Sequence, residues 1–100
     1  MLEDLTRDLF AENLNTTFAV HYGGPEAIAM ELVEVSELRA VGPQRIYTLL
    51  FRGPLEIQLP QRIYRMEHPR LGEFELFIVP VAREHDGMRY EAVFNQLVKE

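Results

Sequence analysis

The chain has 100 residues, the size of a single domain, and its 47% hydrophobic and 26% charged residues are ordinary for a soluble globular protein. It contains no cysteine, which excludes disulfides, thiolate metal sites and thiol catalysis. The formal net charge of −6 disfavours non-specific binding to nucleic acid or anionic lipid. We therefore expect one domain over residues 1–100 and no nucleic-acid partner.

The N-terminus, MLEDLTRDLF, is acidic and has no long apolar run, so no signal peptide is expected. No later segment is apolar over the length that a membrane-spanning helix needs. We expect no membrane association and a cytoplasmic location, the alternative being export by a route that does not use such a signal.

The first predicted element is a short helix near residues 6–13. Thr6 can cap the amides of the first turn, and Asn13 is a suitable end. Leu5 before the cap and Phe10 inside the helix have the spacing of a hydrophobic staple. Two helical turns are not stable alone, so this helix must pack against the rest of the domain.

From residue 16 to residue 95 the apolar residues recur with a period of two, which is typical of β-strands. Gly and Pro turn signals separate the runs, and Asp86-Gly87 is the strongest hairpin signal. The alternating runs lie at residues 16–22, 27–38, 46–52, 55–59, 64–68, 73–79 and 88–94.

Six or seven strands with turns about every eight to twelve residues predict a mainly β fold. We expect a small antiparallel barrel or sandwich with one short N-terminal helix. The large side chains predicted to face inward are Phe18, Tyr22, Tyr47, Phe51, Tyr64, Phe74, Tyr90 and Phe94.

Several strands also carry apolar residues on the face expected to lie outside. One interpretation is that the N-terminal helix, with Leu9 and Phe10, covers part of this face. The other is a subunit or partner interface, because soluble monomers rarely leave a large apolar patch in water; both can hold together. The candidate interface residues are Val33, Val35, Ile46, Leu50, Phe77 and Val79.

Arg52 ends a very apolar strand beside Gly53, so we expect it to be partly buried in an architectural role. It would pair with Glu67 or Glu91, or cap backbone carbonyls. Asn95 is expected to hold a turn after the last strand. The candidate structural polar network comprises Arg52, Glu67, His68, Glu91 and Asn95.

Charge is unevenly distributed along the chain. Residues 1–44 carry eight acids against two arginines, whereas residues 45–70 carry five arginines against two glutamates. These arginines either pair with the acidic first half on solvated strand faces or form an anion-binding or docking patch. The first interpretation is favoured, because scattered strand arginines usually meet carboxylates or water.

The sequence contains no convincing catalytic or metal-binding constellation. The three histidines lack metal-ligand spacing, and the only serine, Ser36, has no nucleophile-elbow context. Glu73 and Glu75 are spaced as residues of a solvent-facing strand rather than as an acid–base pair. We predict no catalytic residue, no metal and no cofactor.

Short runs in the second half form a distinctive string: LFRGP at residues 50–54, LPQ at 59–61, Tyr64, HP at 68–69, LG at 71–72, LFIVPV at 76–81, Gly87 and YEAVFN at 90–95. From about residue 10 to residue 95 the chain resembles a family of small bacterial single-domain proteins classed as a domain of unknown function. It departs from that pattern at Arg62, where Gly is more usual. The resemblance implies no assigned activity, and hence no catalytic residues. Such proteins often lie near genes for tail-collar proteins of phage-like assemblies, which implies an accessory in such an assembly.

We expect a non-catalytic interaction or assembly module with a protein partner or a second copy of the chain. The alternative is a small barrel that binds a small ligand, or performs a simple reaction, in its interior. The bulky inward side chains favour a filled core, although four tyrosine hydroxyls need hydrogen-bond partners.

Overall fold

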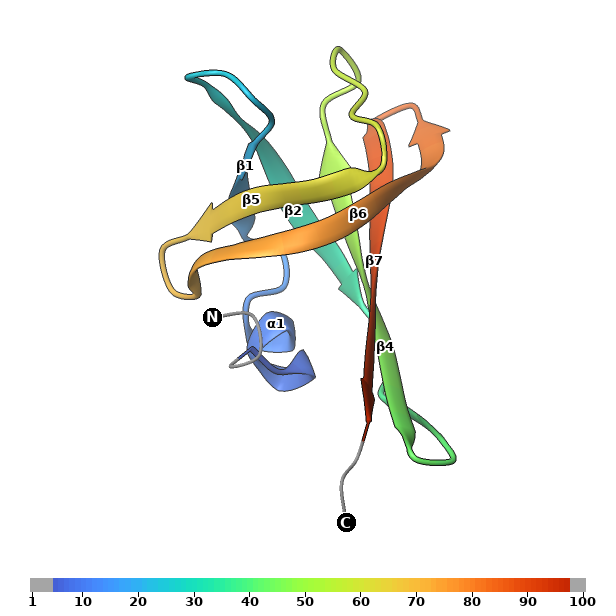
Figure 1. Cartoon of the computed structure of the whole chain (residues 1–100). Coiled ribbons are helices and arrows are strands. Elements are labelled where there is room, and N and C mark those ends of the chain that lie inside the picture. Colours follow the sequence, from blue (N-terminus) through green and yellow to red (C-terminus); the bar gives the residue numbers. More distant parts are fainter. Residues whose placement is uncertain (1–4, 98–100) are drawn as a thin grey trace.

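The computed structural model describes residues 5–97 and contains one short helix and seven strands (Figure 1). Helix α1 spans Arg7–Glu12. The strands are β1 (Thr17–His21), β2 (Ala27–Val35), β3 (Arg39–Val41), β4 (Gln44–Gly53), β5 (Arg62–His68), β6 (Gly72–Glu84) and β7 (Gly87–Leu97).

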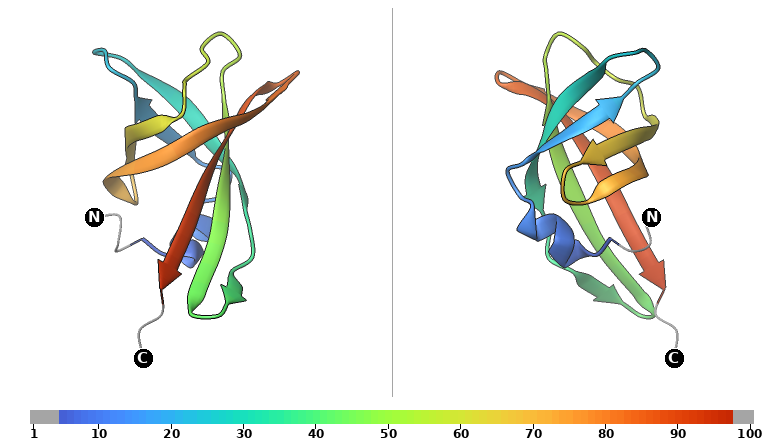
Figure 2. Two further views of the ribbon diagram at one scale, coloured as in Figure 1. Left: turned by 45° about the vertical axis from the view of Figure 1, so that its right-hand side comes forward. Right: turned by 90° about the vertical axis from the view of Figure 1, so that its left-hand side faces the viewer.

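The strands close into a barrel. The sheet order is β2-β1-β5-β6-β7-β4-β3, every pairing is antiparallel, and an additional pairing of β2 with β4 joins the sheet to itself. Six strands thus form a ring, and β3 adds to β4 outside it (Figures 1 and 2). Closure pairs the edges that an open sheet would expose. The predicted antiparallel β fold with one helix is confirmed, and the barrel is the form it takes.

Helix α1 begins and ends where its capping residues predict. The Leu9 amide donates to Thr6 Oγ1 at 3.2 Å, and Asn13 is the C-terminal cap. The buried Phe10 ring lies 6.1 Å from that of Phe74 and 5.6 Å from that of Phe94. Because these two rings belong to the core side of their strands, α1 packs against the barrel interior (Figure 2). The interpretation that Leu9 and Phe10 cover the outer apolar face is therefore wrong.

The connection from β4 to β5 crosses the opposite end of the barrel (Figure 1). It contains residues 55–59, which were expected to form a strand and do not. Pro54 and Pro60 flank this segment, and neither has an N–H to donate to a strand ladder. Its apolar residues cover the barrel instead: Leu59 is buried, and its amide donates to Tyr90 Oη at 3.0 Å.

Large side chains fill the barrel interior. The Phe18 and Phe51 rings meet edge to face at 5.3 Å, and neither is exposed. Tyr22 and Phe94 are only partly buried and pack at the border of the core. The other residues predicted to face inward are buried: Phe18, Tyr47, Phe51, Tyr64, Phe74 and Tyr90.

A β-bulge in β2 changes which residues face the core. Leu32 pairs with Phe51 and Glu34 with Leu50, so Val33 is an extra residue on β2. After the bulge the alternation is shifted by one, and Val35 packs against the core. The expectation that Val35 lies on the outer face is wrong for this reason.

The long strand expected over residues 27–38 is interrupted. It ends at Val35, and β3 pairs separately with the first residues of β4. At the break, Ser36 Oγ accepts a hydrogen bond from the Thr48 amide at 2.8 Å, and the Ser36 amide donates to the Thr48 carbonyl at 2.9 Å.

Within residues 5–97, no helix is long and apolar enough to cross a membrane.

Candidate functional site

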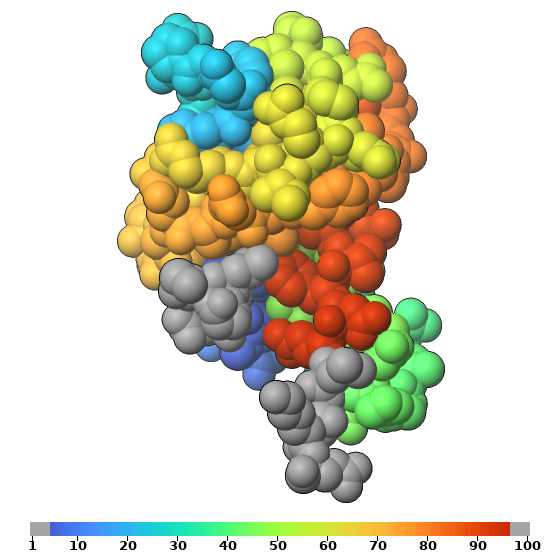
Figure 3. Space-filling model, in the orientation of Figure 1, coloured from blue at the N-terminus to red at the C-terminus, as the bar shows by residue number. Residues whose placement is uncertain are grey.

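Apolar side chains gather on the outside of β5 and β6. Ile63 and Phe77 are directly paired across these strands and point outward, since their neighbours Tyr64 and Ile78 are buried. They are 60% and 49% exposed. In the space-filling view, β5 (yellow) and β6 (orange) lie at the front of the molecule, and their outer surface is visible (Figure 3). A paired Ile and Phe in this position form an apolar surface in contact with water.

The same surface continues onto β7 and β4. Val79 on β6 and Leu50 on β4 both lie opposite Glu91 on β7, and all three side chains are partly exposed. Val93, two residues further along β7, is 60% exposed and lies opposite Thr48. Opposed side chains lie about 5 Å apart and same-face neighbours along a strand about 7 Å, so the surface is continuous. The outer apolar face is defined here as Leu50, Ile63, Phe77, Val79 and Val93.

The sequence identified part of this face. Leu50, Phe77 and Val79 belong to both the predicted and the observed sets. Ile63 and Val93 were not among the candidates, although alternation with the buried Tyr64 and Ala92 places them outside. The remaining predicted residues lie elsewhere: Val35 faces inward, Val33 forms the bulge, and the half-buried Ile46 lies further along β4, opposite Asn95.

The predicted polar residues do not form one network. Arg52 does have an architectural position, but its partners are Glu31 and Asp86 rather than Glu67 or Glu91. Glu31 lies on the adjacent strand β2, directly opposite Arg52. Arg52 Nη1 lies 3.4 Å from Asp86, so the guanidinium connects β4 to both β2 and the β6–β7 turn.

The other polar candidates lie apart from Arg52. Glu67 pairs with His21 and lies 3.7 Å from Arg65. His68 is buried and binds Thr16 and the β5–β6 turn. Asn95 lies within β7, opposite Ile46, and not in a turn as expected, because β7 continues to Leu97.

Of the five arginines between residues 45 and 70, only Arg52 pairs with an acid of the first 44 residues within the described chain. Arg65 binds Glu73 at 2.7 Å, and Arg62 lies over the Tyr64 ring at 5.0 Å. The arginines are thus spread over separate local contacts. Residues 5–97 bring together no group of three histidine or acidic side chains that would hold a metal ion.

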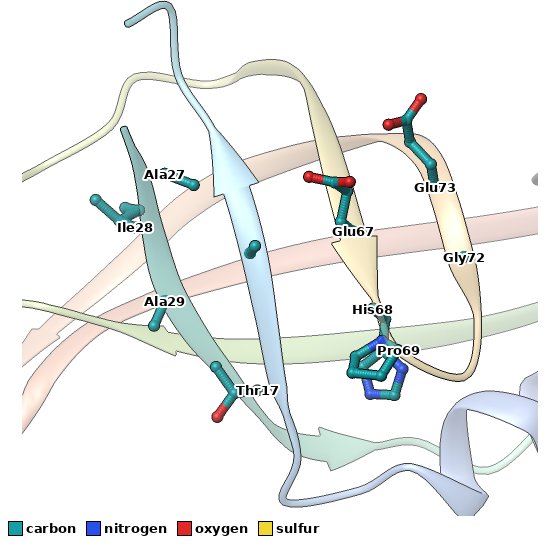
Figure 4. Close-up of a pocket in the computed structure, with 10 residues that line it drawn as sticks. Thr17, Ala27, Ile28, Ala29, Glu67, His68, Pro69, Gly72 and Glu73 are labelled. Carbon is teal, nitrogen blue, oxygen red and sulfur yellow. The ribbon is translucent and has the colours of Figure 1, made fainter. Parts of the chain in front are cut away.

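A shallow groove of about 550 Å³ lies on the outside of β1, β2 and the β5–β6 hairpin (Figure 4). Its floor is formed by small side chains, including Ala19, Ala27 and Ala29. Glu67 and Glu73 line one side (Figure 4), and both already contact Arg65. The floor of the groove is therefore apolar, and the two glutamates at its border already contact an arginine of the same chain.

A second groove, of about 290 Å³, lies between α1 and the ends of β4 and β7, and is lined by Arg7, Tyr47 and Gln96 among others. The Tyr47 hydroxyl is buried and has no hydrogen-bond partner among the described residues. Burial raises the pKa of Tyr47 to about 12, so the hydroxyl stays protonated at physiological pH. The Nε–H group of Arg7 already donates a hydrogen bond to the Ser36 carbonyl at 2.8 Å.

Comparison with known protein families identifies a match over most of the chain. A family model described as "Domain of unknown function (DUF6916)" matches residues 5–94, nearly the whole described chain. No curated protein and no solved structure matches the chain significantly.

Proposed function

We propose that this chain, which belongs to the DUF6916 family of domains of unknown function, is a non-catalytic interaction module that binds a protein partner through the outer apolar face. The observation that carries this proposal is the continuity of the face. Ile63, Phe77 and Val93 are each about half exposed or more, on three neighbouring strands. Contiguous apolar surface of this kind marks interaction sites in soluble proteins.

The packing of the barrel supports the same proposal. Phe10 of α1 packs into the core from one side, Leu59 covers the interior from the other, and bulky side chains occupy the space between. A barrel with a filled interior presents its binding surfaces on the outside of its strands or on its loops. The more specific proposal is that the module is an accessory of a phage-tail-like assembly, and it rests on the resemblance to proteins encoded beside tail-collar genes.

The test is a pull-down of the tagged full chain from host lysate, read by mass spectrometry. Phe77→Glu places a charge in the outer apolar face, and Leu38→Glu is the matched control because Leu38 is 50% exposed on another part of the surface. We expect the wild type and Leu38→Glu to recover the same protein and Phe77→Glu to lose it while keeping its thermal unfolding midpoint. Equal recovery by Phe77→Glu would refute the proposed surface. Recovery of tail structural proteins would support the more specific role.

A second candidate function is the binding of a small ligand. The observation that favours it is the Tyr47 hydroxyl beside its groove, which has no hydrogen-bond partner in the described part of the chain. A ligand bound there would accept a hydrogen bond from Tyr47 Oη. Mass spectrometry of the protein purified under native conditions would detect such a ligand. Its loss from Tyr47→Phe would support this function, and a ligand-free wild type would contradict it.

A further inference from the structure

Glu91 occupies the middle of the outer apolar face. It lies opposite Leu50 on one side and Val79 on the other, with Val93 two residues along the same strand. Its neighbours Tyr90 and Ala92 are buried, so the Glu91 side chain points outward, and it is partly buried among these apolar groups. On both adjacent strands, the residue directly opposite this carboxylate is therefore apolar.

Within residues 5–97 the Glu91 carboxylate has no ion-pair partner and no side-chain hydrogen bond. Two arginines lie two positions from this pairing, Arg89 along β7 and Arg52 beside Leu50 on β4, and both already bind other acids. Arg89 binds Asp86 at 2.9 Å and lies 3.5 Å from Glu84, and Arg52 binds Glu31. Among the described residues, the Glu91 carboxylate thus has no charged partner within the outer apolar face.

This arrangement restricts what can bind. A wholly apolar partner would remove water from Glu91 without replacing it, and burying an unpaired carboxylate is costly. A second copy of the chain is also disfavoured. An isologous contact centred on Glu91 would bring two Glu91 carboxylates together, between chains that each carry a net charge of −6.

We infer that the partner presents an arginine side chain to Glu91, surrounded by apolar residues that pack against Leu50, Phe77 and Val79. This inference rests on the proposed function and specifies its partner. A guanidinium donates two parallel hydrogen bonds to a carboxylate, is weakly hydrated and stacks on aromatic rings, which suits this face better than an ammonium group. Arginine is also among the residues that most often dominate binding energy at interface centres.

The direct test uses benzylguanidinium, which joins an aromatic ring to a guanidinium group, and the ¹⁵N-labelled full chain. We expect saturable shifts in the amide signals of Leu50, Val79 and Glu91, and much weaker shifts with the neutral benzyl alcohol. Glu91→Gln should weaken binding about tenfold, since it replaces a charge-assisted pair by a neutral contact. Glu75→Gln is the matched control, because Glu75 is an exposed glutamate on the outer side of β6, and it should leave the affinity unchanged.

Equal affinity of Glu91→Gln, shifts that map elsewhere, or no shift at all would overturn the inference. The pull-down separates this failure from failure of the proposed function. If Phe77→Glu loses the partner while Glu91→Gln retains it, the result supports the apolar docking surface and refutes arginine recognition. If both variants lose the partner with unchanged folding, and Leu38→Glu retains it, both proposals are supported.

Discussion

The Nε2 atom of His68 lies 2.8 Å from Oγ1 of Thr16, and this contact joins the end of β5 to the segment that follows α1. His68 Nδ1 accepts the amides of Arg70 at 3.0 Å and Leu71 at 3.3 Å, so the ring proton resides on Nε2. Nε2 then donates to Thr16 Oγ1, which in turn donates to the Asn13 carbonyl at 2.6 Å. Every polar atom of the neutral imidazole is used, and a second proton would have no acceptor at Nδ1.

Stability should therefore fall in mild acid. Burial, and secondarily the positive charge of Arg70, lower the pKa of His68 below its ordinary value of 6.5. The unfolded chain takes up a proton near that value and the folded chain only at lower pH. The stabilisation is thus complete above pH 6.5 and is lost as pH falls through the folded-state pKa. Urea unfolding at pH 8, 7, 6 and 5 measures this loss.

The control for this pH dependence is His68→Gln, which removes the titrating group. We expect its free energy of unfolding to be lower than that of the wild type at pH 8 and to change less between pH 7 and pH 5. His85→Gln, at an exposed turn position, is the matched substitution, and it should not remove the pH dependence that His68 causes. An unchanged slope in His68→Gln would show that other groups cause the effect.

Among the buried tyrosines, Tyr47 and Tyr90 should differ in how removal of the hydroxyl changes the free energy of unfolding. Within residues 5–97 the Tyr47 hydroxyl has no hydrogen-bond partner, and the ring stacks on Phe94 at 4.7 Å. Tyr47→Phe therefore keeps the packing and should leave stability unchanged or raise it by up to about 1 kcal/mol. Tyr90→Phe leaves the buried Leu59 amide without its acceptor and should cost about 1–3 kcal/mol. Urea unfolding of both variants provides the comparison. A loss for Tyr47→Phe equal to that for Tyr90→Phe would show that the Tyr47 hydroxyl is satisfied in solution.

Phe51 and Phe77 lie on opposite sides of the barrel wall. Truncating each to alanine should therefore lower the free energy of unfolding by very different amounts. Phe51 is fully buried against Phe18, so Phe51→Ala should cost about 3–5 kcal/mol through lost burial and the cavity left behind. Phe77→Ala, at a half-exposed position, should cost less than about 1 kcal/mol. Similar losses in the free energy of unfolding would contradict the assignment of Phe77 to the outer face.

Gly87 starts β7 at a place where no side chain fits. A Cβ atom there would lie 2.6 Å from the Gly53 carbonyl oxygen and 2.8 Å from Arg52 Cγ, and its φ of +147° is rare for other residues. Gly87→Ala should therefore destabilise by more than about 1 kcal/mol. Gly23→Ala is the control, since Gly23 also has a positive φ but no atom within 4 Å of the added Cβ. The difference between the two thermal midpoints isolates the steric clash, and equal midpoints would mean that the β6–β7 turn shifts away at no cost.

Local pattern determined much of this protein. Capping side chains set the limits of α1 at Thr6 and Asn13, and Asp86-Gly87 marked the β6–β7 turn. Alternation with a period of two identified most of the buried side chains, because successive residues of a strand point to opposite faces wherever the strand is regular.

Only the tertiary structure decided the features that depend on pairing between distant strands. Val35 turned inward because β2 has one extra residue against β4, which alternation within β2 alone does not reveal. Arg52 met Glu31 for the same reason: barrel closure made β2 and β4 neighbours and set their register. The outer apolar face likewise required the register that places Ile63 beside Phe77, and Glu91 between Leu50 and Val79. A sequence specifies which faces of its strands are apolar, whereas the backbone hydrogen bonds between strands determine which of those faces join into one surface.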